Sequence, residues 1–128
     1  MKRITVVGLV LLGGLVFGVQ DYQFTTLVTP GVTEIIGVRE NTAHTVAYVT
    51  TGVSTDVVLR PQGSLDGSNW FHLNDSRVDT TITSNTTIMD HKDGFAYNLF
   101  RVNWVSKSGT GTTPNVAIRY HGSGDLLR

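Results

Sequence analysis

The sequence predicts an all-β protein: an antiparallel β-sandwich or jelly-roll-like fold of about eight strands, preceded by an apolar N-terminal segment. The 128 residues suffice for one domain, and they are rich in Thr, Ser, Gly and Val but poor in strong helix formers. Short runs of alternating apolar and polar residues recur, separated by turn-forming residues. No cysteine is present, so packing or partners must hold the fold together without disulfides.

The first 18 residues differ in character from the rest. Lys2 and Arg3 precede an apolar run that is shorter than the roughly 20 residues needed to span a bilayer. This pattern predicts a secretory signal peptide over residues 1–18 and a β-sandwich domain over residues 19–128. The alternative is an apolar assembly segment, either an anchoring helix or a strand that completes a neighbouring subunit's sheet. We expect a secreted, extracellular protein that touches a membrane only through this segment, if it is uncleaved.

Residues 22–28 contain aromatic residues that alternate with polar ones. This alternation favours a strand, which is either the first strand of the domain or a strand donated to another subunit. The candidate assembly residues in this segment are Tyr22, Phe24, Leu27 and Val28.

Two further strands are predicted over residues 32–38 and 42–50, the second with apolar residues on both faces, as in a central strand. Residues 56–73 then combine strand-forming residues with an Asp66-Gly67 turn signal, which predicts a β-hairpin. Pro61 lies in its first arm and lacks a backbone donor, so we expect a sheet edge or a bulge there. Such an edge makes Pro61 a further candidate assembly residue.

The remaining chain alternates strands with polar connections. Strands are predicted over residues 77–83, 86–89, 95–106 and 114–121, with loops at residues 90–94 and 107–113. The apolar residues expected to face inward on the last two strands are Phe100, Val102, Trp104, Val116, Ile118 and Tyr120.

The hairpin also carries a recognisable motif, Gly-Ser-x-Asp-Gly-x-Asn-Trp from Gly63 to Trp70. Together with the segments at residues 79–83, 100–104 and 116–120, it resembles small β-sandwich proteins of phage structural gene clusters and of secreted viral or bacterial origin. The resemblance implies a structural or surface-exposed module and carries over no catalytic residues. The apolar leader favours an exported protein over one assembled in the cytoplasm.

The sequence predicts no enzyme, cofactor or metal site. The four histidines, at positions 44, 72, 91 and 121, show no ligand spacing, and residues 90–94 lack the alternating oxygen ligands of a calcium loop. Most carboxylates fall in predicted turns, and no nucleophile-elbow motif is present. Ten basic and ten acidic residues give a formal charge of zero, which argues against a nucleic-acid surface.

A glycan-related role is the main alternative to a purely structural one. Trp70 and Tyr97 are candidate glycan contacts, although Trp70 and Trp104 also suit a core position. Asn74 and Asn85 each begin an Asn-x-Ser/Thr sequon and are candidate glycosylation sites.

The leading hypothesis is an exported, non-enzymatic subunit that self-assembles as a homo-oligomer or polymer. The product would be an extracellular filament or virion-type surface assembly built by N-terminal strand donation. The alternative is a monomeric adhesive module that binds surface glycans.

Overall fold

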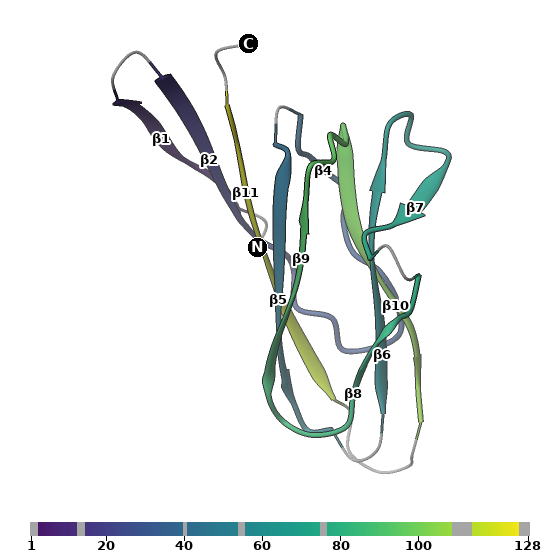
Figure 1. The fold of residues 1–128 in the computed structure, drawn as a ribbon. Coiled ribbons are helices and arrows are strands. Elements are labelled where there is room, and N and C mark those ends of the chain that lie inside the picture. Colours follow the sequence, from purple (N-terminus) through teal and green to yellow (C-terminus); the bar gives the residue numbers. More distant parts are fainter. Residues whose placement is uncertain are drawn as a thin grey trace.

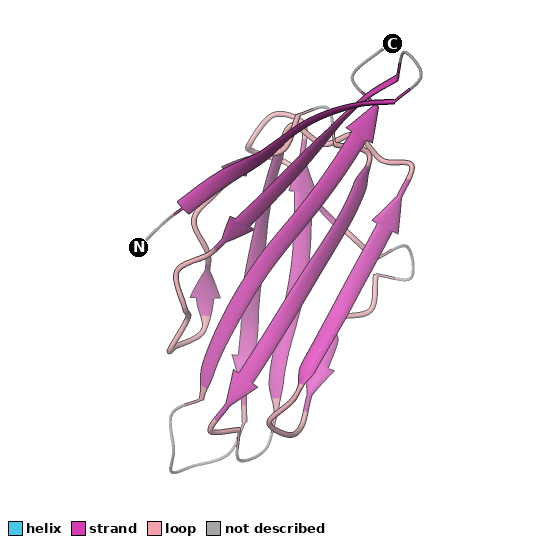
Figure 2. Cartoon of the chain, turned by 90° about the vertical axis from the view of Figure 1, so that its left-hand side faces the viewer, coloured by secondary structure: helices cyan, strands magenta, loops and turns pink. Residues whose placement is uncertain are grey.

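The computed structural model describes residues 3–12, 15–39, 41–53, 56–74, 77–108 and 114–125, with side chains described between residues 19 and 124 of these ranges. Every regular element in them is a β-strand (Figures 1 and 2). The strands are β1 (Arg3–Leu12), β2 (Leu15–Gln23), β3 (Gly31–Val32), β4 (Ile36–Gly37), β5 (Ala43–Thr51), β6 (Val57–Ser64), β7 (Trp70–His72), β8 (Thr80–Ile82), β9 (Thr87–Asp93), β10 (Leu99–Lys107) and β11 (Asn115–Asp125). Within these ranges, no helix could cross a membrane.

The strands form two antiparallel sheets that face each other, which confirms the predicted sandwich (Figure 1). Sheet A has the order β1-β2-β11-β5-β9. Sheet B has the order β3-β10-β6-β7, with β4 pairing to β10 and β8 pairing to β6. The central position predicted for residues 42–50 is also confirmed, because β5 lies between β11 and β9.

Alternate residues of the central strands supply the core between the sheets. Phe100 of β10 and Tyr120 of β11 bring their ring centroids to 4.9 Å of each other across the two sheets. Each large apolar side chain buried in this way contributes roughly 1.5–3 kcal/mol to stability. The predicted inward residues are all buried: Phe100, Val102, Trp104, Val116, Ile118 and Tyr120.

The predicted strand over residues 32–38 is interrupted, leaving only the short strands β3 and β4. Glu34 lies in the interruption, and its carboxylate accepts hydrogen bonds from the Tyr22 hydroxyl at 2.9 Å and the Thr25 N–H at 3.1 Å. Burial and the bond to Glu34 raise the pKa of Tyr22 to about 12. These side-chain bonds connect the interrupted segment to β2 and to the residues that follow it.

The polar segment at residues 90–93 is a strand, so the loop predicted there is wrong. It continues β9 through Asp93, which pairs with Ala43 of β5. Polar residues are tolerated because β9 is the edge strand of sheet A and His91 and Asp93 point to solvent.

The apolar N-terminal segment forms the β1–β2 hairpin, paired from Arg3–Gln23 to Leu12–Leu15. β2 also pairs with β11, and the hairpin leans away from the rest of the sandwich (Figure 1). The side chains of residues 1–18 lie outside the described part, and cleavage after Gly18 stays a prediction.

The candidate assembly residues of the next segment lie within this chain's own fold. Tyr22 and Phe24 are 2% and 1% exposed and belong to the core. Leu27 is half-buried and bridges to Val116 of β11, whereas Val28 is exposed. The segment belongs to its own domain: it ends β2 at Gln23 and stays hydrogen-bonded to β11 at Phe24 and Leu27, rather than being donated to another subunit.

Pro61 is not at a sheet edge, so its predicted placement is wrong. It lies inside β6, opposite Val102 of β10. On its other side the neighbouring strand is split, since β8 pairs with residues 57–59 and β7 with residues 62–64. The Pro61 carbonyl accepts a hydrogen bond from the Leu73 N–H on that side. A strand residue's N and C=O point the same way, so the missing donor faces the gap between β7 and β8 and costs no ladder bond.

Candidate functional site

The predicted β6–β7 hairpin is confirmed, and its turn is closed by side chains. The Asp66 carboxylate accepts hydrogen bonds from the backbone N–H groups of Ser68 and Asn69, both at 2.8 Å. These bonds, with one from the Asn69 amide, hold the pKa of Asp66 well below its usual range. Gly67 adopts φ +81°, which favours glycine. The turn therefore presents β7 in a defined position.

A cleft of about 690 Å³ lies beside β7. One wall comes from the hairpin, β7 and the segment after it, and the other comes from the connection between β9 and β10, where the chain passes from sheet A to sheet B. The described lining residues are Leu65, Trp70, Phe71, His72, Asn74, Arg77, Phe95, Ala96 and Tyr97.

Aromatic rings dominate this lining. Phe71 is 53% exposed and Phe95 is 48% exposed. Tyr97 is buried and stacks against Phe95, with ring centroids 5.7 Å apart and an angle of 24° between the planes. Trp70 is half-buried, and the Arg101 guanidinium lies 4.1 Å from its ring centroid. The cleft thus offers apolar ring surface at the protein's exterior.

A close approach to β6 fixes Tyr97. A Cβ atom on Gly63 would lie 2.4 Å from Cγ of Tyr97, so only glycine lets the ring lie directly against the strand. The His44 ring centroid lies 5.4 Å from that of Tyr97 on another side.

His44 connects the β9–β10 wall of the cleft to the core by hydrogen bonds. Its Nε2 lies 2.7 Å from the Phe95 carbonyl oxygen and its Nδ1 lies 2.6 Å from the Tyr120 hydroxyl. Because a carbonyl only accepts, Nε2 carries the hydrogen and Nδ1 accepts from Tyr120. Burial lowers the pKa of His44 and so favours this neutral form.

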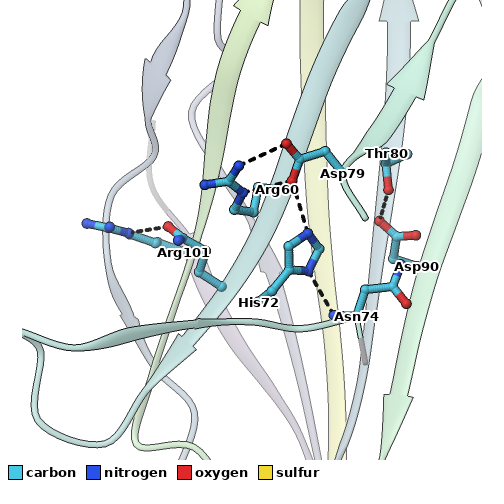
Figure 3. Close-up of polar contacts among 8 residues, drawn as sticks. Arg60, His72, Asn74, Asp79, Thr80, Asp90 and Arg101 are labelled. Carbon is cyan, nitrogen blue, oxygen red and sulfur yellow. Dashed lines mark hydrogen bonds and ion pairs between the residues drawn. The ribbon is translucent and has the colours of Figure 1, made fainter. Parts of the chain in front are cut away.

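A polar network supports the first wall (Figure 3). Asp79 accepts two hydrogen bonds from the Arg60 guanidinium, at 2.7 and 2.9 Å, and lies 3.1 Å from Nε2 of His72. The Asn74 N–H donates to Nδ1 of His72 at 3.0 Å, so Nε2 carries the hydrogen that points to Asp79. The bonds from Arg60 lower the pKa of Asp79. His72 is thereby held at the cleft by two oriented contacts.

Some of the residues predicted to contact or carry glycans line the cleft, and others do not. Trp70 and Tyr97 both line the cleft, whereas Trp104 is a core residue. Asn74 also lines the cleft, but the other two residues of its sequon lie outside the described residues. Asn85 is exposed, and its side-chain oxygen accepts a hydrogen bond from the Val53 N–H at 3.0 Å.

Sequence reasoning missed Phe95 and Arg77 as contributors to the cleft. It predicts Phe95 within the strand over residues 95–106 and Arg77 within the strand over residues 77–83. The positive φ of Gly94, +77°, is the local signal that the chain leaves β9 before Phe95. Across the described ranges, no group of three or more potential metal ligands comes together.

The fold and the site together define an antiparallel β-sandwich with an aromatic surface cleft. No family model matches the chain, and no curated protein sequence matches it. Among solved structures, the SPBc2 prophage-derived protein YomS is similar in fold, with a TM-score of 0.62 and 14% identity over 90% of this chain and 99% of YomS.

Two carbohydrate-binding structures align more loosely. The cellulose-binding domain of Cellulomonas fimi β-1,4-glucanase C has a TM-score of 0.45 and 10% identity over 94% of this chain and 84% of that one. A family 4 carbohydrate-binding module has a TM-score of 0.42 and 10% identity over 98% of this chain and 78% of that one. Scores this low support no conclusion about this chain.

Proposed function

We propose that this protein is a non-enzymatic surface module that binds saccharides in the cleft beside β7. The observation that carries the proposal is the combination of exposed ring surface with polar groups in one cleft of about 690 Å³. Small-molecule sites are typically concave and mostly apolar, with a few polar groups that orient the ligand.

The chemistry of the lining suits a sugar. Sugar rings have apolar C–H faces that pack on aromatic rings, and their hydroxyl groups need hydrogen-bond partners. Phe71 and Trp70 supply ring surface, while the Asn74 amide and the Arg77 guanidinium supply polar groups. The supporting bonds of His44 and His72 hold both walls before a ligand arrives, which reduces the ordering cost of binding.

A glycan array followed by calorimetric titration of the bound saccharides tests this proposal. Phe71→Ala should weaken binding about tenfold or more, since a central aromatic contact contributes about 1.4 kcal/mol or more when it anchors a ligand. Met89→Ala is a matched control because Met89 is 67% exposed on β9, away from the cleft. Absence of any saccharide binding, or equal affinities for the Phe71 variant and the wild type, would refute the proposal.

Self-assembly is a second candidate function, and the position of β1 favours it. β1 is the outer strand of sheet A, so one row of its backbone groups is free to pair with a strand of another copy. Because Tyr22 and Phe24 are core residues, pairing through β1 replaces donation of residues 22–28 as the proposed route.

Deletion of residues 1–14 tests assembly while leaving the core strand segment intact. We expect light scattering and electron microscopy to show polymers of the full chain and monomers of the deletion variant. Polymers of the shortened protein would contradict a role for β1. The intact mass of the native, exported material would show whether the leader is removed after Gly18, in which case β1 takes no part in the mature protein.

A further inference from the structure

The described lining of the cleft carries positive charge and no negative charge. Among its described lining residues, Arg77 carries a permanent charge and none carries a carboxylate. Asp79, the acid of the supporting network, is already bound by Arg60 and His72. The described lining therefore lacks a negative group that would repel an anion.

Arg77, which lines the cleft, and Arg101, which lies against the lining residue Trp70, differ from Arg60 in their pairing. Arg60 forms an ion pair with Asp79, whereas neither Arg77 nor Arg101 forms one with any residue that the structure describes. Arg77 is exposed and lines the cleft. Arg101 is partly buried against the Trp70 ring, and its Nε donates to the Gln62 side chain at 2.9 Å.

A partly buried guanidinium that has no carboxylate partner favours the binding of an anionic ligand. Burial removes water from the Arg101 guanidinium, as the lowering of its pKa by burial also indicates. Guanidinium groups bind carboxylate and sulfate oxygens through paired, charge-assisted hydrogen bonds. Arg101 also covers a face of Trp70, so an anionic group near it would lie beside a ring that packs against a sugar.

We infer that the saccharide bound in this cleft is acidic, and that Arg77, assisted by Arg101, binds its anionic group while Trp70 and Phe71 contact the ring. This inference rests on the proposed saccharide-binding function. It adds the chemical class of the ligand, which ring contacts alone leave open. Uronic acids, sialic acids and sulfated sugars share the required chemistry.

The test uses a glycan array that carries uronate, sialylated and sulfated saccharides, each beside its neutral counterpart. We expect binding to acidic members and weak or no binding to neutral ones. Equal binding to acidic and neutral members overturns the inference but leaves the saccharide-binding proposal standing. Absence of binding to every member overturns both.

Titration of each bound acidic saccharide against two charge-matched variants then assigns the residue. Arg77→Gln should weaken binding about 10- to 100-fold, whereas Arg119→Gln, which removes the same charge from an exposed position on β11, should have little effect. Arg77→Lys should restore part of the loss and increase the dependence of affinity on salt. Equal losses for the Arg77 and Arg119 variants would show only a general charge effect and would refute the role of Arg77.

Discussion

The contact between Gly63 and Tyr97 gives the sharpest stability prediction. In Gly63→Ala, the new Cβ would lie 2.4 Å from Cγ of Tyr97, whereas ordinary contact begins at 3.4 Å. The ring must retreat by about 3.4 − 2.4 = 1.0 Å, a shift of the size that makes overpacking costly. Tyr97 is 5% exposed and is packed against Phe95 and His44, so little room is available.

Overpacking of this kind costs about 1–3 kcal/mol, and the entropy lost by the unfolded chain on replacing glycine offsets about 0.4–1 kcal/mol. We therefore expect a net destabilisation of about 1–2 kcal/mol, or a Tm lower by roughly 4–8 °C. Saccharide affinity should fall as well, because the displaced ring lines the cleft.

Urea unfolding followed by circular dichroism measures this change. Gly37→Ala is the matched control, since a Cβ on Gly37 meets nothing within 4 Å. In a Tyr97→Ala background the Gly63→Ala change should cost almost nothing, because the obstructing ring is gone. If the Gly63 and Gly37 variants are equally stable in the wild-type background, the close approach does not constrain the fold and the reasoning fails.

Three further predictions concern the core and its supporting bonds. Burial lowers the pKa of His44 below its ordinary 6.5, so the unfolded chain binds a proton more readily and stability should fall as the pH drops below about 6.5. Urea unfolding at several pH values should show this slope, and His44→Gln should flatten it. Asp79→Asn should cost about 0.5–1 kcal/mol, a modest value because the Arg60 side chain is 37% exposed, and Asp93→Asn at a 73% exposed site should cost little. Phe24→Ala should cost about 3–5 kcal/mol, and a variant that loses only assembly while keeping its stability would contradict its core position.

Much of the fold could be predicted because the apolar and polar residues of the central strands indicate which face of each strand is buried. In β10, Phe100, Val102 and Trp104 alternate with the polar Arg101 and Asn103, and a period of two places the three apolar residues together on the buried face. Val46 and Tyr48 of β5 are buried in the same way. The hairpin turn was equally predictable, because Asp66 and Gly67 determine its conformation locally.

Features that depend on distant partners were not predictable in this way. Pro61 suggested an edge because the split of its neighbour into β7 and β8 is a tertiary feature. The polar residues of β9 suggested a loop because pairing to β5, rather than local preference, makes them a strand. Phe95 was missed as a cleft residue for the same reason, since it lies near β7 only once the two sheets have packed.

The pairing of β2 with β11 joins the two ends of the chain in sheet A. Gln23 pairs with Arg119, a separation of 119 − 23 = 96 residues. During synthesis, β2 emerges long before its partner strand, and non-local pairing of this kind is slow to form. The edge of β2 that pairs with β11 therefore stays unpaired until almost the whole chain has been synthesised. Until β11 docks, that edge can form backbone hydrogen bonds with any extended segment that reaches it, including one from another copy of the chain.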